Sequence, residues 1–281
     1  MTAVLQNRET LVVLATYNER SNIDRLLDAI LALPCRCDIL VVDDNSPDGT
    51  GARVQARAAS EARIHLAARA ARGGVGSAHR FGWLYARRSG YARVVTLDAD
   101  FSHDPSDIPR LLDALDAGAD VALGSRFVPG GKLDYQGWRL FLSRTANGLA
   151  HMVLRLPIAE YTTSFRAARL DRVPAGLVET IPNNGYAFFL TAIVRLARQR
   201  LRITEVPIHF HERDSGASKM PRLEILRGTA NLLSHVLHRR PFVPASSDAV
   251  ASPSCSRCGS PYVVRSPDGS ATCLNCMTTV G

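Results

Sequence analysis

The sequence predicts an α/β protein built on a doubly wound, mostly parallel sheet. From residue 11 onward, short apolar runs alternate with segments of helical periodicity, the order that produces parallel strands joined by helices. Several runs end abruptly in carboxylates, as the run 94–97 ends in Asp98 and Asp100. A chain of 281 residues, 46% hydrophobic and 21% charged, can bury the core that such a sheet needs.

The first part of the chain shows a repeating strand–helix order. We predict strands at 11–15, 37–42 and 64–66, with one helix after a cap at Ser21 or Asn22 and another after the turn at 45–50. The crossovers between parallel strands are expected to be right-handed.

The rest of the chain continues this strand–helix order until the sequence pattern changes near residue 129. The predicted elements are a helix opening near residue 76, a strand at 94–97, a helix at 105–115, a strand at 120–123, helices at 138–156 and 187–198, a strand at 204–210 and an amphipathic helix at 223–237.

The paired carboxylates Asp98 and Asp100 follow a buried strand. Ligands of open α/β sheets bind beyond the carboxyl ends of the strands, and two carboxylates there repel each other unless a cation lies between them. Mg²⁺ or Mn²⁺ is commonly held by such acids together with substrate phosphates. The alternative is that both acids cap the following turn and helix.

Other candidate residues lie at the same predicted edge. Asp43 and Asp44 end the second strand, where a nucleotide's ribose and base are commonly bound, and Arg126 follows the strand at 120–123. The glycine-rich segment 72–78, which contains Gly76, opens a helix. Its backbone N–H groups suit an anion, but tight packing of the loop on the helix explains the glycines equally well.

The C-terminal part of the chain differs in composition from the rest. We predict a globular domain at 1–240, a Pro-, Ala- and Ser-rich linker at 241–254 and a tail at 255–281. Two CxxC pairs in the tail, Cys255 with Cys258 and Cys273 with Cys276, are typical of a zinc ribbon with four thiolate ligands. A pair of disulfides or a vestigial tail is the alternative.

Charge and hydropathy limit the partners and the location. The net charge is +8 and the pI is about 9.5, which favours anionic partners without choosing among nucleotides, phospholipid headgroups and nucleic acid. The sequence has no run of about 18 apolar residues and no apolar signal core near its N-terminus, so we expect a cytosolic protein without a membrane-spanning helix.

An ordered set of motifs then resembles a known family. The motifs are TYNE at 16–19, VVDDNSPDGT at 41–50, GSA at 76–78, DADFSH at 98–103, GSRF at 124–127, GG at 130–131, Trp138, SRTAN at 143–147, YTTSFR at 161–166, GYAF at 185–188 and GASK at 216–219. Together they resemble the dolichol-phosphate (polyprenol-phosphate) mannosyltransferases of glycosyltransferase family 2, over roughly residues 10 to 237.

The resemblance implies a GT-A fold, a nucleotide-sugar donor, a divalent metal ion at the DxD motif and a polyprenyl-phosphate acceptor at the cytosolic face of the membrane. GDP-mannose is the expected donor. The residues that the resemblance assigns fall into four groups: for donor binding, Thr16, Tyr17, Glu19, Asp43, Asp44, Gly76, Asp98, Ala99 and Asp100; for the metal ion, Asp98, Asp100 and Ser102; for the donor phosphates, Arg213 and Lys219; for the acceptor phosphate, Arg126, Arg139 and Ser143.

This chemistry agrees with the residue types. A phosphate monoester acceptor is already an anion at neutral pH, so an inverting transfer needs no general base. It needs stabilisation of the departing diphosphate by the metal ion and by cations such as Arg213 and Lys219. Arginine suits phosphate because its planar fork binds two oxygens at once. Arg139 and Ser143, four residues apart, are expected to share one helix face.

The sequence leaves other functions open. Phe189 and Thr191 stand where many members of the resembling family have Gln and Glu, which favours a different donor, such as UDP-glucose, or a soluble acceptor. A non-catalytic zinc-ribbon module on a transferase scaffold is a further alternative, and the intact DxD motif argues against it. If the acceptor is a lipid, the helices predicted at 138–156 and 223–237 are the candidates for membrane contact.

Overall fold

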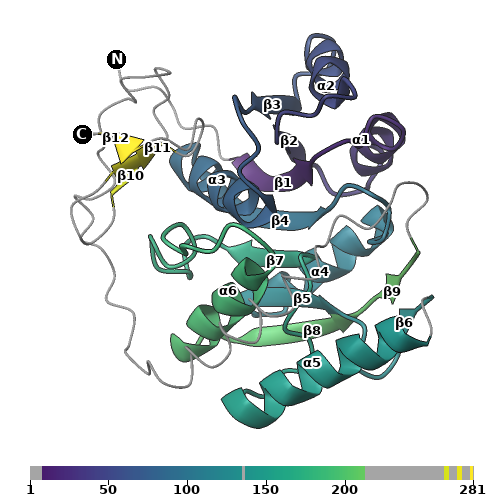
Figure 1. The fold of residues 1–281 in the computed structure, drawn as a ribbon, viewed down its shortest axis with the longest axis vertical. Helices are drawn as coiled ribbons and strands as arrows, with labels where there is room; N and C mark the ends of the chain where they lie inside the picture. The colour runs from purple at the N-terminus through teal and green to yellow at the C-terminus, as the bar shows by residue number, and fades with distance from the viewer. Residues whose placement is uncertain (1–7, 135–136, 213–262, 266–270, 274–278, 281) are drawn as a thin grey trace.

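The computed structural model describes residues 8–134, 137–212, 263–265, 271–273 and 279–280. Its centre is a seven-stranded sheet with the order β3-β2-β1-β4-β7-β5-β8, which runs from top to bottom in Figure 1. The strands are β1 (Arg8–Thr16), β2 (Asp38–Asp43), β3 (Ile64–Ala68), β4 (Tyr91–Asp98), β5 (Val121–Ser125), β7 (Arg166–Arg169) and β8 (Ile203–Pro207).

Helices connect these strands and cover both faces of the sheet. They are α1 (Ile23–Leu31), α2 (Thr50–Ala58), α3 (Val75–Arg88), the short 3₁₀ helix η1 (Pro105–Asp107), α4 (Ile108–Asp116), α5 (Trp138–Leu154) and α6 (Ala187–Arg198). A separate parallel pair joins β6 (Lys132–Leu133) to β9 (His209–Phe210).

The sheet is mostly parallel, as predicted. β1 pairs in parallel with β2 and with β4, β2 with β3, and β5 with β8. Only β7 runs antiparallel, between β4 and β5. β4 and β5 therefore point the same way, and Thr16, Asp43, Asp98 and Ser125, which end four of the parallel strands, lie at one edge of the sheet.

The core follows the alternation of side chains along each central strand. On β1, Leu11 and Val13 belong to the apolar cluster that also holds α3 and α6, whereas Val12 and Leu14 belong to the cluster with α1 and α4. Both faces of the strand are fully buried, which explains why the sequence shows continuous apolar runs. The result is the three-layer α/β/α arrangement of Figure 1.

Most predicted elements are present, and the main differences concern one helix and two strands. The helix predicted at 105–115 begins with one 3₁₀ turn, where Asp104 accepts a hydrogen bond from the Ser106 N–H, before the α-helix starts at Ile108. The strand predicted at 204–210 divides into β8 and β9. β7 was not predicted, because its sequence RAAR has no apolar run.

Several predictions concern residues outside the described part. The linker at 241–254, the helix at 223–237, Arg213, Lys219, Cys255, Cys258 and Cys276 all fall there. Cys273 lies on β11 (Ala271–Cys273), which pairs in antiparallel fashion with β10 (Val263–Arg265) and β12 (Thr279–Val280). Among the described residues, no helix has the length and apolar character needed to cross a bilayer.

Candidate active site

The two DxD carboxylates lie in different surroundings at the end of β4. The Asp98 side chain is partly exposed, and its Oδ1 accepts a hydrogen bond of 2.7 Å from the Ser164 hydroxyl. Asp100 is buried, and its Oδ1 accepts the Ser102 backbone N–H at 3.1 Å. Phe101, which follows Asp100, has a left-handed backbone with a φ of 60°, and this conformation gives the sharp turn after the strand.

His103 supports this turn. Its imidazole is fully buried, packed against the rings of Phe165 and Phe210 with centroids 5.2 and 5.1 Å away. Burial lowers the pKa of His103 to about 3 despite the neighbouring Asp100 carboxylate, so the ring is neutral near pH 7. Its Nδ1 can therefore accept the Asp98 backbone N–H, at 3.3 Å. His103 thus has a structural role in the turn.

These residues fit a hard divalent cation. Asp98 and Asp100 supply carboxylate oxygens, Ser102 adds a hydroxyl, and His103 carries no charge that would neutralise the acids. Oxygen donors of this kind suit Mg²⁺ or Mn²⁺. The carboxylate of Asp98 is partly accessible to solvent, so a metal ion bound to it could also bind a diphosphate.

The second pair of acids divides into two roles. Asp43 ends β2, and it accepts hydrogen bonds from the Thr16 hydroxyl at 3.0 Å and from the Ser46 backbone and hydroxyl. Asp43 and Thr16 thus couple the ends of two adjacent strands. This is the position at which nucleotides bind open α/β sheets.

Asp44 instead holds the glycine-rich segment. Its carboxylate accepts the backbone N–H groups of Gly73 and Gly74 at 2.9 and 2.7 Å, and it pairs with Arg69 at 2.8 Å. The Arg69 side chain is fully buried and also donates to the Ser77 hydroxyl. The described contacts therefore give Asp44 a structural role. The N–H groups of Gly73 and Gly74 already donate to this carboxylate, so they are not available to bind an anion.

Gly76 is in tight contact with the loop before α6. A Cβ at this position would lie 2.6 Å from Phe188 Cβ and 2.7 Å from the Asn183 carbonyl oxygen, and the Gly76 N–H already donates to the Asn184 carbonyl at 2.7 Å. Of the two sequence interpretations, these contacts favour packing of the loop on the helix.

Tyr17 and Glu19 flank the same edge. The Arg72 guanidinium stacks over the Tyr17 ring at 3.9 Å from its centroid, which joins β1 to the glycine-rich segment. Glu19 is buried; its carboxylate accepts from the Asn22 side chain at 3.0 Å and its backbone N–H donates to the Thr50 hydroxyl. Asn22 was predicted as a possible cap of α1, and it lies at the cap position without a capping side-chain hydrogen bond.

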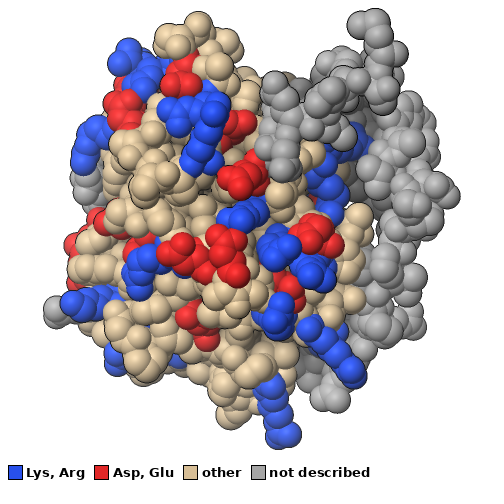
Figure 2. All heavy atoms as spheres, turned by 180° about the vertical axis from the view of Figure 1, so that it is seen from behind, with Lys and Arg blue, Asp and Glu red and all other residues tan. Residues whose placement is uncertain are grey.

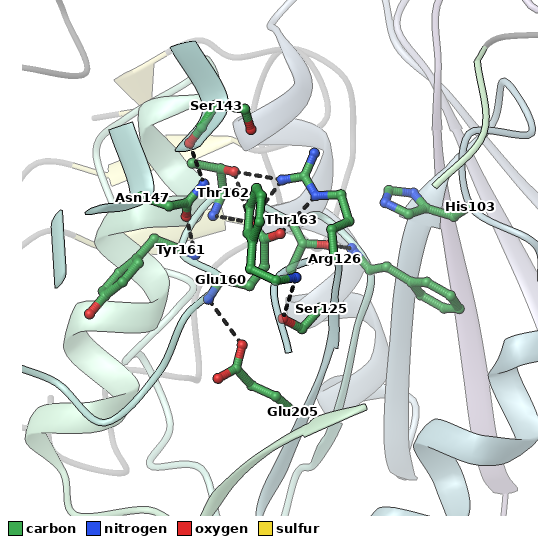
Figure 3. Close-up of polar contacts among 12 residues, drawn as sticks. His103, Ser125, Arg126, Ser143, Asn147, Glu160, Tyr161, Thr162, Thr163 and Glu205 are labelled. Carbon is green, nitrogen blue, oxygen red and sulfur yellow. Dashed lines mark hydrogen bonds and ion pairs between the residues drawn. The ribbon is translucent and has the colours of Figure 1, made fainter. Parts of the chain in front are cut away.

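Arg126 lies at the end of β5, and its guanidinium is paired. Nε and Nη2 donate to the two carboxylate oxygens of Glu160 at 2.7 and 2.9 Å, and Nη2 also contacts the Thr162 hydroxyl at 3.0 Å (Figure 3). Glu160 is fully buried and the Arg126 side chain is 9% exposed. The guanidinium also lies over the Phe210 ring at 4.9 Å.

The loop that carries Glu160 is anchored to α5. The Tyr161 N–H donates to the Asn147 side chain at 2.8 Å, and the Asn147 amide donates to the Ser143 carbonyl at 2.9 Å (Figure 3). Glu205 on β8 accepts the N–H groups of Ala159 and Glu160. Ser143 thus lies on a helix whose position relative to Arg126 is fixed by this network. The backbone of Arg139 lies one turn earlier on α5.

An open pocket with basic side chains lies beside this network. It has a volume of about 720 Å³, and its lining includes Arg126, Lys132, Arg144 and His209 together with Leu140 and Asp134. Three cations and two leucines, Leu133 and Leu140, around an open pocket suit an anion that is attached to an apolar group.

Several of these residues had not been selected from the sequence. Arg69 follows the end of β3 at the same sheet edge, so the strand-end argument applied to Asp43 could have found it. Glu160 and Ser164 gave no such signal, because their partners are 34 and 66 residues away. Phe189 and Thr191, which depart from the resembling family, are both buried on α6.

The sequence matches the model of Glycosyl transferase family 2 over residues 11–172, which is more than half of the chain. The chain belongs to this family. It is therefore a glycosyltransferase, and the matched range contains the DxD motif, the acidic end of β2 and Arg126.

Curated relatives of this glycosyltransferase cover most of its length. It is 40% identical to the polyprenol monophosphomannose synthase of Mycolicibacterium smegmatis over 77% of the chain and 83% of the relative. It is 38% identical to the undecaprenyl-phosphate mannosyltransferase of Micrococcus luteus over 75% of the chain and 86% of that relative.

Solved structures share the fold of this glycosyltransferase at lower identity. Glucosyl-3-phosphoglycerate synthase from Mycobacterium tuberculosis, in complex with Mn²⁺, UDP and its product, aligns with a TM-score of 0.56 at 21% identity over 85% of this chain and 82% of that one. Mannosyl-3-phosphoglycerate synthase from Rubrobacter xylanophilus aligns with a TM-score of 0.57 at 18% identity over 97% and 86%. These likenesses support the predicted GT-A fold.

Proposed function

We propose that this protein transfers mannose from GDP-mannose to a polyprenyl phosphate, with a divalent metal ion at Asp98, Asp100 and Ser102. The observation that carries the proposal is the similarity, at 40% and 38% identity over about three quarters of the chain, to two proteins named for mannosyl transfer to polyprenyl phosphates.

The arrangement of charges supports a metal-bound donor. The strand-end carboxylates lie at the edge that also carries Asp43 and Thr16, so one nucleotide could extend from its ribose near Asp43 to its diphosphate near Asp98. Bound there, the metal ion would stabilise the negative charge that develops on the leaving diphosphate. Arg213 and Lys219 remain proposed contributors to the same stabilisation, and they lie outside the described residues.

The pocket beside Arg126 supports an anionic acceptor. Arg126, Lys132 and Arg144 line it, and the α5 residues Leu140 and Arg144 place an apolar and a basic side chain together. Because Arg126 is held by Glu160, we propose that it contributes a fixed and partly neutralised charge, and that Arg144 adds the second cation for the acceptor phosphate. Ser143 and Arg139 keep their proposed roles on the same helix.

The outer face of α5 supports a lipid acceptor. Phe141, Leu149 and Met152 are exposed by 68%, 38% and 65%, and they are the large hydrophobic side chains exposed within the described residues. Their spacing places them along one side of the helix. We propose that this side enters the membrane interface, which would bring a polyprenyl phosphate to the pocket.

The surface charge gives less support to nucleic acid as a partner. On the face drawn in Figure 2, acidic and basic side chains are interspersed among the described residues and form no continuous basic stripe.

A transfer assay with matched donors and acceptors tests the proposal. Radiolabelled GDP-mannose and UDP-glucose are each offered with a polyprenyl phosphate or with 3-phosphoglycerate, in Mg²⁺, Mn²⁺ or EDTA. We expect label in the lipid phase only with GDP-mannose, polyprenyl phosphate and metal. Transfer to 3-phosphoglycerate, or transfer that EDTA leaves unchanged, would contradict the acceptor or the metal part of the proposal.

We also propose that residues 255–281 bind one zinc ion through Cys255, Cys258, Cys273 and Cys276, on the basis of the CxxC spacing. Elemental analysis of the purified protein against Cys273→Ser tests this. Equal zinc contents in the two proteins would contradict it.

A further inference from the structure

A second cluster of metal-ligating side chains includes neither of the DxD carboxylates. Asp134, His209 and His211 place one ligand atom each within 4.8 Å of one another. Asp134 Oδ1 lies 2.5 Å from His209 Nε2, and Asp134 Oδ2 lies 3.0 Å from His211 Nδ1. The two imidazole rings are adjacent, with centroids 4.1 Å apart.

The backbone fixes the positions of the three residues. The Lys132 and Asp134 N–H groups donate to the carbonyls of Ile208 and Phe210, at 2.9 and 3.0 Å, and so hold β6 beside β9. His209 and His211 are two residues apart on extended chain, so their side chains point to the same side. The His211 N–H donates to the Ser102 carbonyl, which ties the cluster to the turn after the DxD motif.

The cluster is accessible to ions. The side chains of Asp134, His209 and His211 are 40%, 42% and 37% exposed, and Asp134 and His209 line the open pocket described above. A tetrahedral zinc ion with bonds of about 2.0–2.1 Å holds its ligand atoms about 3.3 Å apart. The observed separations to the carboxylate differ from this by less than 1 Å, which side-chain rotation at an exposed site can supply.

We propose that Asp134, His209 and His211 form a binding site for Zn²⁺, separate from the DxD metal site and from the cysteine-rich tail. Two imidazole nitrogens and one carboxylate oxygen are a donor set typical of zinc, and three protein ligands leave one coordination position for water or a phosphate oxygen. The ion would join β6 to β9 next to the pocket that Arg126 lines.

Hydrogen bonding alone is the competing explanation, because a carboxylate between two imidazoles also holds two segments together. The explanations differ in one respect. A hydrogen-bonded cluster gains nothing from zinc, whereas a metal site gains stability that grows with the logarithm of the zinc concentration over its dissociation constant.

The test is a zinc titration of the full chain in which Cys255, Cys258, Cys273 and Cys276 are replaced by Ser, so that the tail contributes no thiolates. In this background we compare His209→Gln, His211→Gln and His65→Gln by calorimetry in excess Mg²⁺. His65 is the matched control, since its Nε2 lies 4.0 Å from Asp38 and no third ligand completes a cluster there among the described residues.

We expect the background protein and His65→Gln to bind one more equivalent of Zn²⁺ than His209→Gln and His211→Gln, or to bind it at least about tenfold more tightly. Zinc at a hundred times its dissociation constant should raise the Tm of the first two proteins by about 5–10 °C more than that of the histidine variants. Equal zinc binding and equal Tm shifts in all four proteins would overturn the proposal.

Discussion

Arg126 and Glu160 form an ion pair with two hydrogen bonds, and Glu160 is fully buried. The pair joins the end of β5 to the loop before β7, within the network drawn in Figure 3. A buried charge that loses its partner is far more costly than an exposed one, so this contact links the candidate acceptor pocket to the stability of the fold.

Glu160→Ala should therefore destabilise the protein by about 3–5 kcal/mol, because the guanidinium of Arg126, which is only 9% exposed, loses its carboxylate partner. Asp116→Ala is the matched control. It removes the partner of Arg93 in an exposed pair and should cost less than about 1 kcal/mol. Urea denaturation of the three proteins gives both values, and similar costs for the two variants would contradict the importance of burial.

The same pair has a pH signature. Burial opposes the charge of Glu160, but the charge and hydrogen bonds of Arg126 outweigh it and hold the pKa of Glu160 below its ordinary value of 4.5. The stabilisation is then fully present above about pH 4.5 and is lost as the pH falls toward the lower folded value. The difference in unfolding free energy between wild type and Glu160→Ala should be constant from pH 7 to pH 5 and should shrink at lower pH.

Asp100→Asn should reduce transfer by about a hundredfold or more, because the metal ion would lose a charged ligand while the far-UV circular dichroism stays unchanged. Asp113→Asn, the same change at an exposed position of α4, is the control and should retain full activity. Rates measured with saturating Mn²⁺ decide the matter. An active Asp100→Asn enzyme would remove this carboxylate from the mechanism.

Two glycines on helices separate the effect of packing from that of helix propensity. Gly76→Ala should cost about 1–3 kcal/mol, since its methyl group would lie 2.6 Å from Phe188 Cβ. Gly148→Ala on α5 meets nothing within 4 Å and should stabilise the protein by about 0.5–1 kcal/mol. Thermal unfolding measures both, and a neutral Gly76→Ala would show that the loop before α6 moves away easily.

The exposed side of α5 leads to a prediction about binding to membranes. Phe141→Ser combined with Met152→Ser should weaken binding to anionic lipid vesicles by about tenfold or more, because each side chain gains roughly 1.5–3 kcal/mol when it leaves water completely. The Tm should hardly change, since both side chains are exposed by about two thirds. Vesicle co-sedimentation measures the affinity. Unchanged affinity would assign membrane contact to another part of the chain.

Local sequence patterns were sufficient for the parallel strands of the central sheet and for the helices that cover it. The apolar run that becomes β4 and the acids that follow it are adjacent in the chain, so the position of Asp98 and Asp100 at a sheet edge was predictable. The helix at 187–198 was predicted with the bounds of α6. The periodicity of apolar side chains and the positions of turn residues involve only near neighbours in the chain, so both can be read directly from the sequence.

The position of β7 was not predictable in this way. Its four residues include Arg166, which is buried. The guanidinium donates to the carbonyls of Thr163 and Phe189, and these hydrogen bonds offset the cost of burying it. A buried arginine in a strand has no apolar signature in the sequence. Its place between β4 and β5 depends on hydrogen bonds from segments far along the chain.

The sequence by itself determined the fold class, the family resemblance and the acids at the strand ends, because each depends on motifs of a few adjacent residues. Only the tertiary structure decided what these side chains contact. It pairs Asp44 with Arg69 and the glycine-rich segment, and Arg126 with Glu160. It also places Asp134 beside His209 and His211, which follow it by 75 and 77 residues. The physical reason is that hydrogen bonds and ion pairs act over a few ångströms in space, and folding alone brings such distant residues within that range.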